Sequence, residues 1–348
     1  MSRFKSSEEF IEVTSPSNIA FVKYWGKYGI QKPINPSVSM TLKQCTSRFK
    51  VFFSTKEDSI ISHFEFEGCA QNSFKDKIES FLQAQIDSFP ILKDHSISIS
   101  CDNSFPHSSG IASSASSMSA LVFAIASFQN KKAIHDLSIE QMSSLARLAS
   151  GSASRSLFSK MSHWGKSSLP KSSDDFALPL LPISDVFEDL NDAILIIDKG
   201  VKSVSSTTGH KLMDDHIYRN IRIEQANNNL EKITNAISSG NLSVFGQVLE
   251  EEALSLHSLM MTSNPSFILM KPNTLKSIER IRTFRNETNA HCYFTLDAGA
   301  NLHLLYPASD KAIVEEFIDN SLKELCVDNE VIYDQMGMGP IIKEVSLE

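Results

Sequence analysis

The first half of the chain contains a run of small and hydroxyl-bearing side chains, PHSSGIASSASS at 106–117, directly before an amphipathic helical pattern over 118–128. Small side chains let a ligand approach the backbone, and the free N–H groups at the start of a helix favour a phosphate. The hydroxyl groups of Ser113 and Ser114 could also bind a magnesium ion carried by nucleotide phosphates, because Mg²⁺ prefers oxygen ligands. A serine-rich N-cap that packs tightly on a neighbouring element is the alternative.

A second cluster, SGSASRS at 150–156, places several hydroxyl groups beside one guanidinium group. Arg155 could hold a phosphate or a carboxylate through two parallel hydrogen bonds, while Ser150 and Ser152 bond the remaining oxygens. The alternative is a surface turn with a solvated arginine.

The N-terminal segment contains two lysines, Lys23 and Lys27, four residues apart and beside the aromatic pair Tyr24 and Trp25. Taken alone, the lysines would be solvated surface charges and the aromatic pair would belong to the core.

An acidic residue stands at the end of a predicted strand in the second half, in TLDAGAN at 295–301. The alanine and glycine that follow Asp297 leave space for another molecule to approach. A carboxylate there can orient or deprotonate a hydroxyl group, but an aspartate that caps a turn is equally common.

Together these four stretches closely resemble the diphosphomevalonate decarboxylase family, within the superfamily that also contains galactokinase, homoserine kinase, mevalonate kinase and phosphomevalonate kinase. The family motif NIAxxKYWGK matches residues 18–27, and its loop GLASSA matches 110–115. Its motif SGSA[CS]RS matches 150–156, and DAGPN matches 297–301. The order and spacing of these motifs agree along nearly the whole chain.

The resemblance implies that ATP phosphorylates the tertiary 3-hydroxyl of mevalonate 5-diphosphate, after which loss of phosphate and carbon dioxide yields isopentenyl diphosphate. It implies ATP and Mg²⁺ as cofactors, Asp297 at the 3-hydroxyl group, and Lys23 near the reacting carboxylate and phosphate. The substrate's anionic groups are assigned to Tyr24, Lys27, Ser150, Gly151, Ser152, Lys202 and Arg155, the last also counted as catalytic. ATP is assigned to Ser108, Ser109, Gly110, Ile111, Ala112, Ser113 and Ser114, with magnesium on the last two.

The chain departs from the family pattern at a few positions. Pro36 replaces a small polar residue, Ala300 replaces the proline of DAGPN, and Ser159-Lys160 replaces a Gly-Gly pair.

Two other functions stay open. One is a related decarboxylase or 3-kinase that acts on mevalonate or mevalonate 5-phosphate, and the other is a noncatalytic binding protein with the same fold.

The length of 348 residues is too great for one ordinary core and predicts two lobes. A stretch with three prolines over 165–185 places the boundary, so that 1–184 is an N-terminal lobe with the phosphate loop. Residues 185–348 then form a C-terminal lobe that carries Asp297. The resemblance implies a two-lobed α+β fold, with a left-handed βαβ unit in the N-terminal lobe and a cleft between the lobes.

Hydrophobic patterns place the secondary structure. Apolar and β-branched runs predict strands over 48–54, 96–101, 193–197, 291–296 and 302–306. Besides the helix at 118–128, helical spacing predicts helices over 223–237, 242–256 and 275–281, the first of them ended by Ser239-Gly240-Asn241.

Composition limits the partners. A net charge of −8 disfavours nucleic acid or an anionic membrane. Apolar runs are too short to cross a bilayer, and no secretory signal is recognisable, so a cytoplasmic location is expected. Five scattered cysteines without a C-x-x-C pair predict reduced, mostly buried thiols and no zinc site. The family resemblance also implies a homodimer and a small-molecule substrate, mevalonate 5-diphosphate.

Overall fold

The computed structural model describes residues 9–106, 111–200 and 206–347. Within these residues the larger sheet has seven strands, with the main order β13-β1-β4-β6-β5 and with β7 and β8 attached beside β4. Its strands are β1 (Glu9–Val22), β4 (Ser37–Thr55), β5 (Ile61–Phe66), β6 (His95–Asn103), β7 (Met161–Trp164), β8 (Ala177–Pro179) and β13 (Ile341–Ser346). The strands predicted at 48–54 and 96–101 lie within β4 and β6 and are confirmed.

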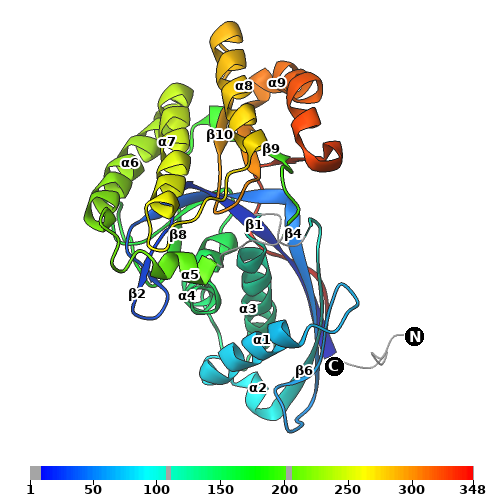
Figure 1. The fold of residues 1–348 in the computed structure, drawn as a ribbon. Coiled ribbons are helices and arrows are strands. Elements are labelled where there is room, and N and C mark those ends of the chain that lie inside the picture. The colour runs from blue at the N-terminus through cyan, green and yellow to red at the C-terminus, as the bar shows by residue number, and fades with distance from the viewer. Residues whose placement is uncertain (1–8, 107–110, 201–205, 348) are drawn as a thin grey trace.

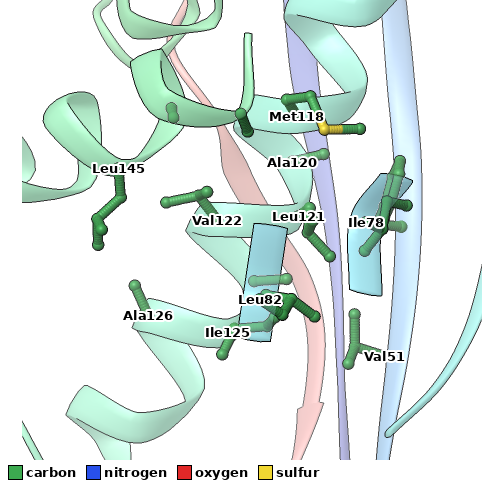
Figure 2. Close-up of a cluster of buried hydrophobic side chains, with 14 of the residues drawn as sticks. Val51, Ile78, Leu82, Met118, Ala120, Leu121, Val122, Ile125, Ala126 and Leu145 are labelled. Atoms are coloured by element: carbon green, nitrogen blue, oxygen red, sulfur yellow. The ribbon is translucent and has the colours of Figure 1, made fainter. Parts of the chain in front are cut away.

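Helix α3 (Ser113–Lys131) packs on this sheet and confirms the helix predicted at 118–128. Figure 2 shows Leu121 and Ile125 of α3 in the apolar cluster that also contains Val51 of β4. Two serines of α3 face the strands instead of a ligand. Ser116 and Ser119 exchange hydrogen bonds with serine hydroxyls of β4 and β1 at 2.7 and 2.6 Å, so the serine-rich packing alternative holds for this part of the run.

Strands β5 and β6 run parallel and are joined by α1 (Asn72–Ala84) and α2 (Ile91–Asp94), which makes a βαβ unit. The handedness of this unit stays a prediction. Helix α4 (Ile139–Ala149) begins at a capping box formed by Ser138 and Gln141. It is followed by a short 3₁₀ helix, η1 (Gly151–Leu157), and a small hairpin, β2 (Lys27–Tyr28) with β3 (Lys32–Pro33), lies elsewhere in this half.

The smaller sheet has the order β10-β11-β9-β12. Its strands are β9 (Asn191–Leu195), β10 (Tyr293–Thr295), β11 (Leu302–Tyr306) and β12 (Val331–Gln335). The strand predicted at 302–306 is confirmed, and β10 is shorter than the predicted 291–296. The strand predicted at 193–197 is displaced by two residues. The strand begins with two polar residues, Asn191 and Asp192, which an apolar pattern does not predict. Asp192 can be buried in the sheet because it is paired with His303 at 2.7 Å.

The helices predicted in the second half are confirmed. They are α6 (Arg219–Ser239), α7 (Leu242–Met261) and α8 (Pro272–Thr288), accompanied by the short α5 (Ser206–Lys211) and α9 (Lys311–Phe317). Gly240, with a φ of 78°, ends α6 in the left-handed conformation that glycine adopts without steric cost. Among the described residues, no helix combines the length and apolar character needed to cross a membrane.

The two halves share a core. Figure 1 shows α6 to α9 gathered at one end of the molecule and α1 to α3 at the other, with β1 and β4 running between them. Phe21 of β1 packs edge-on against Phe245 of α7, with ring centroids 5.1 Å apart. The last strand, β13, pairs with β1 and therefore lies in the larger sheet. The boundary at 184/185 stays a prediction. All five cysteines are free and four are buried, as expected.

Candidate functional site

A polar cleft lies where the two halves meet and collects most of the predicted site residues. The end of β1, the start of α3 and η1 contribute from the first half, and the segment after β10 contributes from the second. The predicted residues that line it are Lys23, Tyr24, Lys27, Ala112, Ser114, Ser150, Gly151, Ser152, Arg155 and Asp297. The side chain of Ile111 instead belongs to a buried core, and Ser113 is not among the lining residues. Ser108, Ser109, Gly110 and Lys202 lie outside the described residues.

Lys23 and Asp297 form an ion pair inside the cleft. Lys23 Nζ lies 2.8 Å from Asp297 Oδ1, and the side chains are 2% and 26% exposed. Burial lowers the pKa of the Lys23 ammonium, and the carboxylate of Asp297 opposes that shift. Behind the pair, His257 Nε2 lies 3.1 Å from the carbonyl oxygen of Asp297. Both residues line the cleft, and Asp297 is the more exposed of the two.

A buried salt bridge holds the backbone of Lys23 from the other half of the molecule. Arg222 of α6 and Glu252 of α7 are 2.6 Å apart and both side chains are buried. Glu252 Oε2 accepts a hydrogen bond from the Lys23 N–H at 2.8 Å, and Arg222 donates to the Lys23 carbonyl at 3.0 Å. Asn229 donates to the second oxygen of Glu252 at 2.8 Å. Arg222 and Glu252 together form a clamp on the Lys23 backbone. This clamp fixes the end of β1 from which the Lys23 side chain extends.

Arg155 lines the cleft, and its guanidinium has no acidic ion-pair partner among the described residues. Its guanidinium donates to Ser37 and Ser39 at 2.6 and 3.0 Å and to Asn18 at 3.2 Å. These acceptors are neutral. Burial lowers the pKa of Arg155 to about 10, which leaves it protonated at neutral pH. The predicted alternative of a solvated arginine in a surface turn is wrong, because Arg155 is 3% exposed.

Tyr24 presents an unpartnered hydroxyl group to the site. The Tyr24 Oη atom is buried and has no hydrogen-bond partner among the described residues. A Cβ atom at Gly151 would lie 2.6 Å from that oxygen, so only glycine leaves room for it. A buried hydroxyl group without a partner costs free energy unless a ligand or water bonds to it. Tyr24 is therefore suited to bind an incoming anion.

The start of α3 is built to receive phosphate. Ala112, at its N-cap, has a left-handed φ of 45° and no side chain caps the first turn. The Ala115 N–H donates to the Ala112 carbonyl at 2.7 Å, so among the described residues the N–H groups of Ser113 and Ser114 are the ones left for a phosphate. Ser114 is exposed in the cleft, and Ser150 donates a long 3.4 Å hydrogen bond to its hydroxyl.

Magnesium fits this position as an ion carried by phosphate oxygens. The described residues contain no cluster of three histidine, cysteine or acidic side chains that could hold a metal. The hydroxyl of Ser114, which lines the cleft, is the better placed of the two predicted ligands. A nucleotide would supply the other oxygens, as Mg²⁺ commonly requires.

Several residues that the sequence did not point to also line the cleft. Lys77 of α1 lies there beside Lys27, and neither lysine has an ion-pair partner within the described ranges. Burial, and then the charge of Lys77, lower the pKa of Lys27 to about 8. His210 of α5 is the other notable addition. Lys77 had no recognisable signal, because a lysine within an amphipathic helix is ordinarily a solvated charge.

The departures from the family motifs lie outside the cleft. The Ala300 carbonyl accepts a hydrogen bond from Thr274, and the Ser159 hydroxyl accepts one from the Gly339 N–H. Lys160 is paired with Glu188. Pro36 packs against Gly165, where a Cβ atom would lie 2.8 Å from the Pro36 Cα atom. These substitutions therefore affect loop packing rather than the groups that face a ligand.

Comparison with known proteins gives consistent matches along the chain. The family model for the diphosphomevalonate decarboxylase-like N-terminal domain matches residues 15–177, and that for the mevalonate 5-diphosphate decarboxylase C-terminal domain matches 193–342. A diphosphomevalonate decarboxylase from Candida albicans is 28% identical over 312 residues, which is 86% of this chain and 84% of the relative.

Solved structures agree with the sequence matches. The mevalonate diphosphate decarboxylase from Staphylococcus aureus superposes with a TM-score of 0.84 at 27% identity and covers 97% of this chain and 98% of its own. The structure of MDDEF in complex with MVAPP, AMPPCP and magnesium also gives a TM-score of 0.84, at 26% identity, with 97% and 100% covered. The similarity thus extends over both sheets and the cleft between them.

Proposed function

Because this chain belongs to the diphosphomevalonate decarboxylase family, we propose that it catalyses the ATP-dependent decarboxylation of mevalonate 5-diphosphate. The products are isopentenyl diphosphate, ADP, phosphate and carbon dioxide. The observation that carries the proposal is the Lys23–Asp297 pair, at 2.8 Å, in a cleft that also contains the buried guanidinium of Arg155, which has no acidic ion-pair partner among the described residues. A similar protein that binds MVAPP, AMPPCP and magnesium together supports it.

Asp297 and Lys23 carry the first step. The carboxylate of Asp297 receives the hydrogen bond of the substrate's 3-hydroxyl, whose oxygen attacks the terminal phosphorus of ATP while ADP leaves. The hydroxyl proton passes toward the Asp297 carboxylate. Lys23 holds that carboxylate in one orientation, because its ammonium lies 2.8 Å away. Positioning and charge are the main contributions of the protein to such a transfer.

The second step needs charge stabilisation and little covalent chemistry. The phosphorylated oxygen departs as phosphate, and the C–O bond electrons leave with it. Positive charge builds on C3 of the substrate. The substrate's own carboxylate then leaves as carbon dioxide, and the electron pair of the broken C–C bond forms the double bond. Lys23 and Arg155 are the cations placed to stabilise the anions of this step. Closure of the cleft around the substrate would exclude water from the carbon centre.

The remaining residues hold the anionic groups. The first turn of α3 with Ala112 and Ser114 binds the ATP phosphates, and Mg²⁺ neutralises part of their charge when bound. Arg155, Lys27 and Tyr24 bind the diphosphate of the substrate, together with the hydroxyls of Ser150 and Ser152 beside Gly151. Lys77 adds a further cation to the same cleft. The roles predicted for Lys202 and for residues 108–110 stay predictions.

The assay that tests this function measures ADP release with mevalonate, mevalonate 5-phosphate and mevalonate 5-diphosphate as separate substrates. Mass spectrometry of each reaction then looks for the alkene and for carbon dioxide. ADP and alkene together, from the diphosphate, support the proposal. ADP without alkene identifies a 3-kinase, preference for mevalonate or its monophosphate identifies the related enzyme, and no ADP from any substrate identifies a noncatalytic binding protein.

Arg155→Leu should lower kcat/KM for mevalonate 5-diphosphate by at least about tenfold. A hydrogen-bonded charged contact of this kind contributes about 1.5–3 kcal/mol. Arg155→Lys should restore only part of the loss, because an ammonium group lacks the planar fork. Steady-state kinetics of both variants test this. Arg48→Leu, which removes an exposed arginine paired with Asp102 on β4, is the control and should behave like the wild type. Wild-type kinetics in Arg155→Leu would place the substrate elsewhere.

Affinity for mevalonate 5-diphosphate should fall as the pH rises from 7 to 9. The pKa of Lys27, about 8, means that Lys27 loses its charge in this interval, while the diphosphate is already fully ionised. Loss of one linked proton weakens binding by up to about tenfold per pH unit above the pKa. Calorimetric titration without ATP measures the effect. Lys27→Arg stays protonated and should flatten the pH dependence, and an equal slope in both proteins would contradict this role for Lys27.

Three further features are proposed. The homodimer rests on the resemblance to the family, the cytoplasmic location on the absence of a recognisable signal or membrane-spanning run in the sequence, and the division into lobes at 184/185 on the proline-rich stretch. The net charge of −8 supports a small-molecule substrate over nucleic acid as the partner.

A further inference from the structure

His210 occupies a slot between two aromatic rings at the cleft. Its ring centroid lies 4.4 Å from that of Tyr24 and 4.7 Å from that of Trp25, with interplanar angles of 39° and 36°. The preceding Gly209 makes this possible, because a Cβ atom there would lie 2.5 Å from the Trp25 ring. Two rings and a close backbone approach therefore fix the plane of the imidazole.

The hydrogen bond of His210 determines which ring nitrogen carries the proton. The Gly26 backbone N–H donates to His210 Nδ1 at 2.8 Å. A backbone N–H can only donate, so Nδ1 is the acceptor and the proton of the neutral ring must be on Nε2. Nε2 has no hydrogen-bond partner within the described part of the chain, and the His210 side chain lines the cleft. The ring thus offers the site one unused donor.

His210 lies close to the cations of the proposed diphosphate site. Burial lowers its pKa well below the usual value, and the charges of Lys27 and Arg155 lower it further. The imidazole therefore stays neutral, and its side chain lines the same cleft as Lys27 and Arg155.

We propose that His210 is a substrate-binding residue whose Nε2–H donates a hydrogen bond to the diphosphate group, and that this bond favours the diphosphate substrate over its monophosphate. The inference rests on the proposed function for the identity of the substrate. A neutral donor that shares the cleft with two cations adds a directional bond to an anion whose charge they attract. A monophosphate has one phosphoryl group fewer with which to engage Lys27, Arg155 and His210.

Kinetics of His210→Phe and His210→Gln test the role. Phenylalanine keeps the ring in its slot but has no donor, so KM for mevalonate 5-diphosphate should rise about tenfold or more. KM for ATP should change less than about twofold, and discrimination against the monophosphate should shrink. Glutamine can place an amide N–H near the Nε2 position and should recover part of the loss. Equal KM changes for ATP and mevalonate 5-diphosphate in both variants would show that His210 only packs against its neighbours and does not bind the substrate.

His216 provides a matched control on the same segment. Its Nε2 bonds to the Leu259 carbonyl at 3.0 Å, its Nδ1 accepts from the Tyr218 N–H at 3.1 Å, and it does not line the cleft. His216→Phe removes a buried histidine and its hydrogen bonds, including one with Thr262 at 3.3 Å, so it should lower the melting temperature and leave both KM values unchanged. A rise in KM for the diphosphate in His216→Phe would show that general loosening, not the Nε2–H of His210, explains the result.

A binding measurement separates this inference from the proposed function. ¹⁵N NMR of the histidines of the full chain should show His210 protonated at Nε2, and inorganic diphosphate should shift that signal without ATP present. A wild-type protein that shifts with diphosphate but turns over no substrate would refute the function and keep the site. A protein that decarboxylates mevalonate 5-diphosphate, yet shows no shift with diphosphate or a proton on Nδ1, would overturn the role of His210.

Discussion

The Asp297→Asn variant should turn over mevalonate 5-diphosphate about 10²- to 10⁴-fold more slowly than the wild type, the range for loss of a positioned acid–base group. The amide keeps the shape of the side chain but removes the charge that faces the 3-hydroxyl group. It also leaves Lys23, whose ammonium is 2% exposed, without its counter-charge. ADP release under saturating ATP measures the loss.

Nucleotide affinity should be nearly unchanged in Asp297→Asn, because the proposed site for the ATP phosphates, at the start of α3, consists of other residues. Fluorescent-nucleotide binding measures this directly. Asp328→Asn is the control, since Asp328 pairs with Lys199 on the exposed surface of the same half. Near-native turnover in Asp297→Asn would remove Asp297 from the reaction, and loss of nucleotide binding would point to a folding defect.

Glu252→Gln should lower the free energy of unfolding by about 3–5 kcal/mol, the cost of leaving one member of a buried ion pair without its partner. Glu252 is 0% exposed and Arg222 is 2% exposed. Burial alone would raise the pKa of Glu252, but the charge and hydrogen bonds of Arg222 outweigh burial and keep the carboxylate ionised. Urea denaturation followed by circular dichroism measures the difference.

A double variant separates stability from positioning at this clamp. Replacing Arg222 by Met and Glu252 by Leu removes both charges, so stability should recover relative to Glu252→Gln. Turnover should stay low, because the Lys23 N–H has lost Glu252, while the Lys23 carbonyl has lost Arg222 and keeps its hydrogen bond from Asn35. Full recovery of turnover would show that the clamp only stabilises the fold. Glu324→Gln, at an exposed ion pair with Arg280, is the control and should change stability little.

Sequence patterns determined the elements whose cause is local. The apolar spacing of 223–237 and 242–256 predicted α6 and α7, and the intervening glycine predicted their break, because periodicity and turn chemistry act within a few residues. The motifs at 18–27, 150–156 and 297–301 indicated the family and the types of residue expected at the site. The roles of these residues stay predictions, based on the types of group that the reaction demands.

The tertiary structure decided which groups meet. Asp297 reaches Lys23 across 274 positions of sequence separation, and Glu252 reaches the Lys23 backbone across 229. No local pattern encodes such contacts, since they depend on how β1 and the helices of the second half pack. The start of β9 was hidden for a related reason, because Asp192 is accommodated in a strand only by His303 on β11.

His210 and Lys77 show the same limit at the site itself. Each stands in a short or ordinary helical stretch, where histidine and lysine are usually structural or solvated. Their position in the cleft depends on Gly209 passing close to Trp25 and on the fold bringing Lys77 of α1 to the same cleft as Lys27. Local sequence thus determined the chemistry that the chain can perform. Long-range packing decided which charges and donors surround the substrate, because the field in a cleft is the sum of groups brought together by the fold.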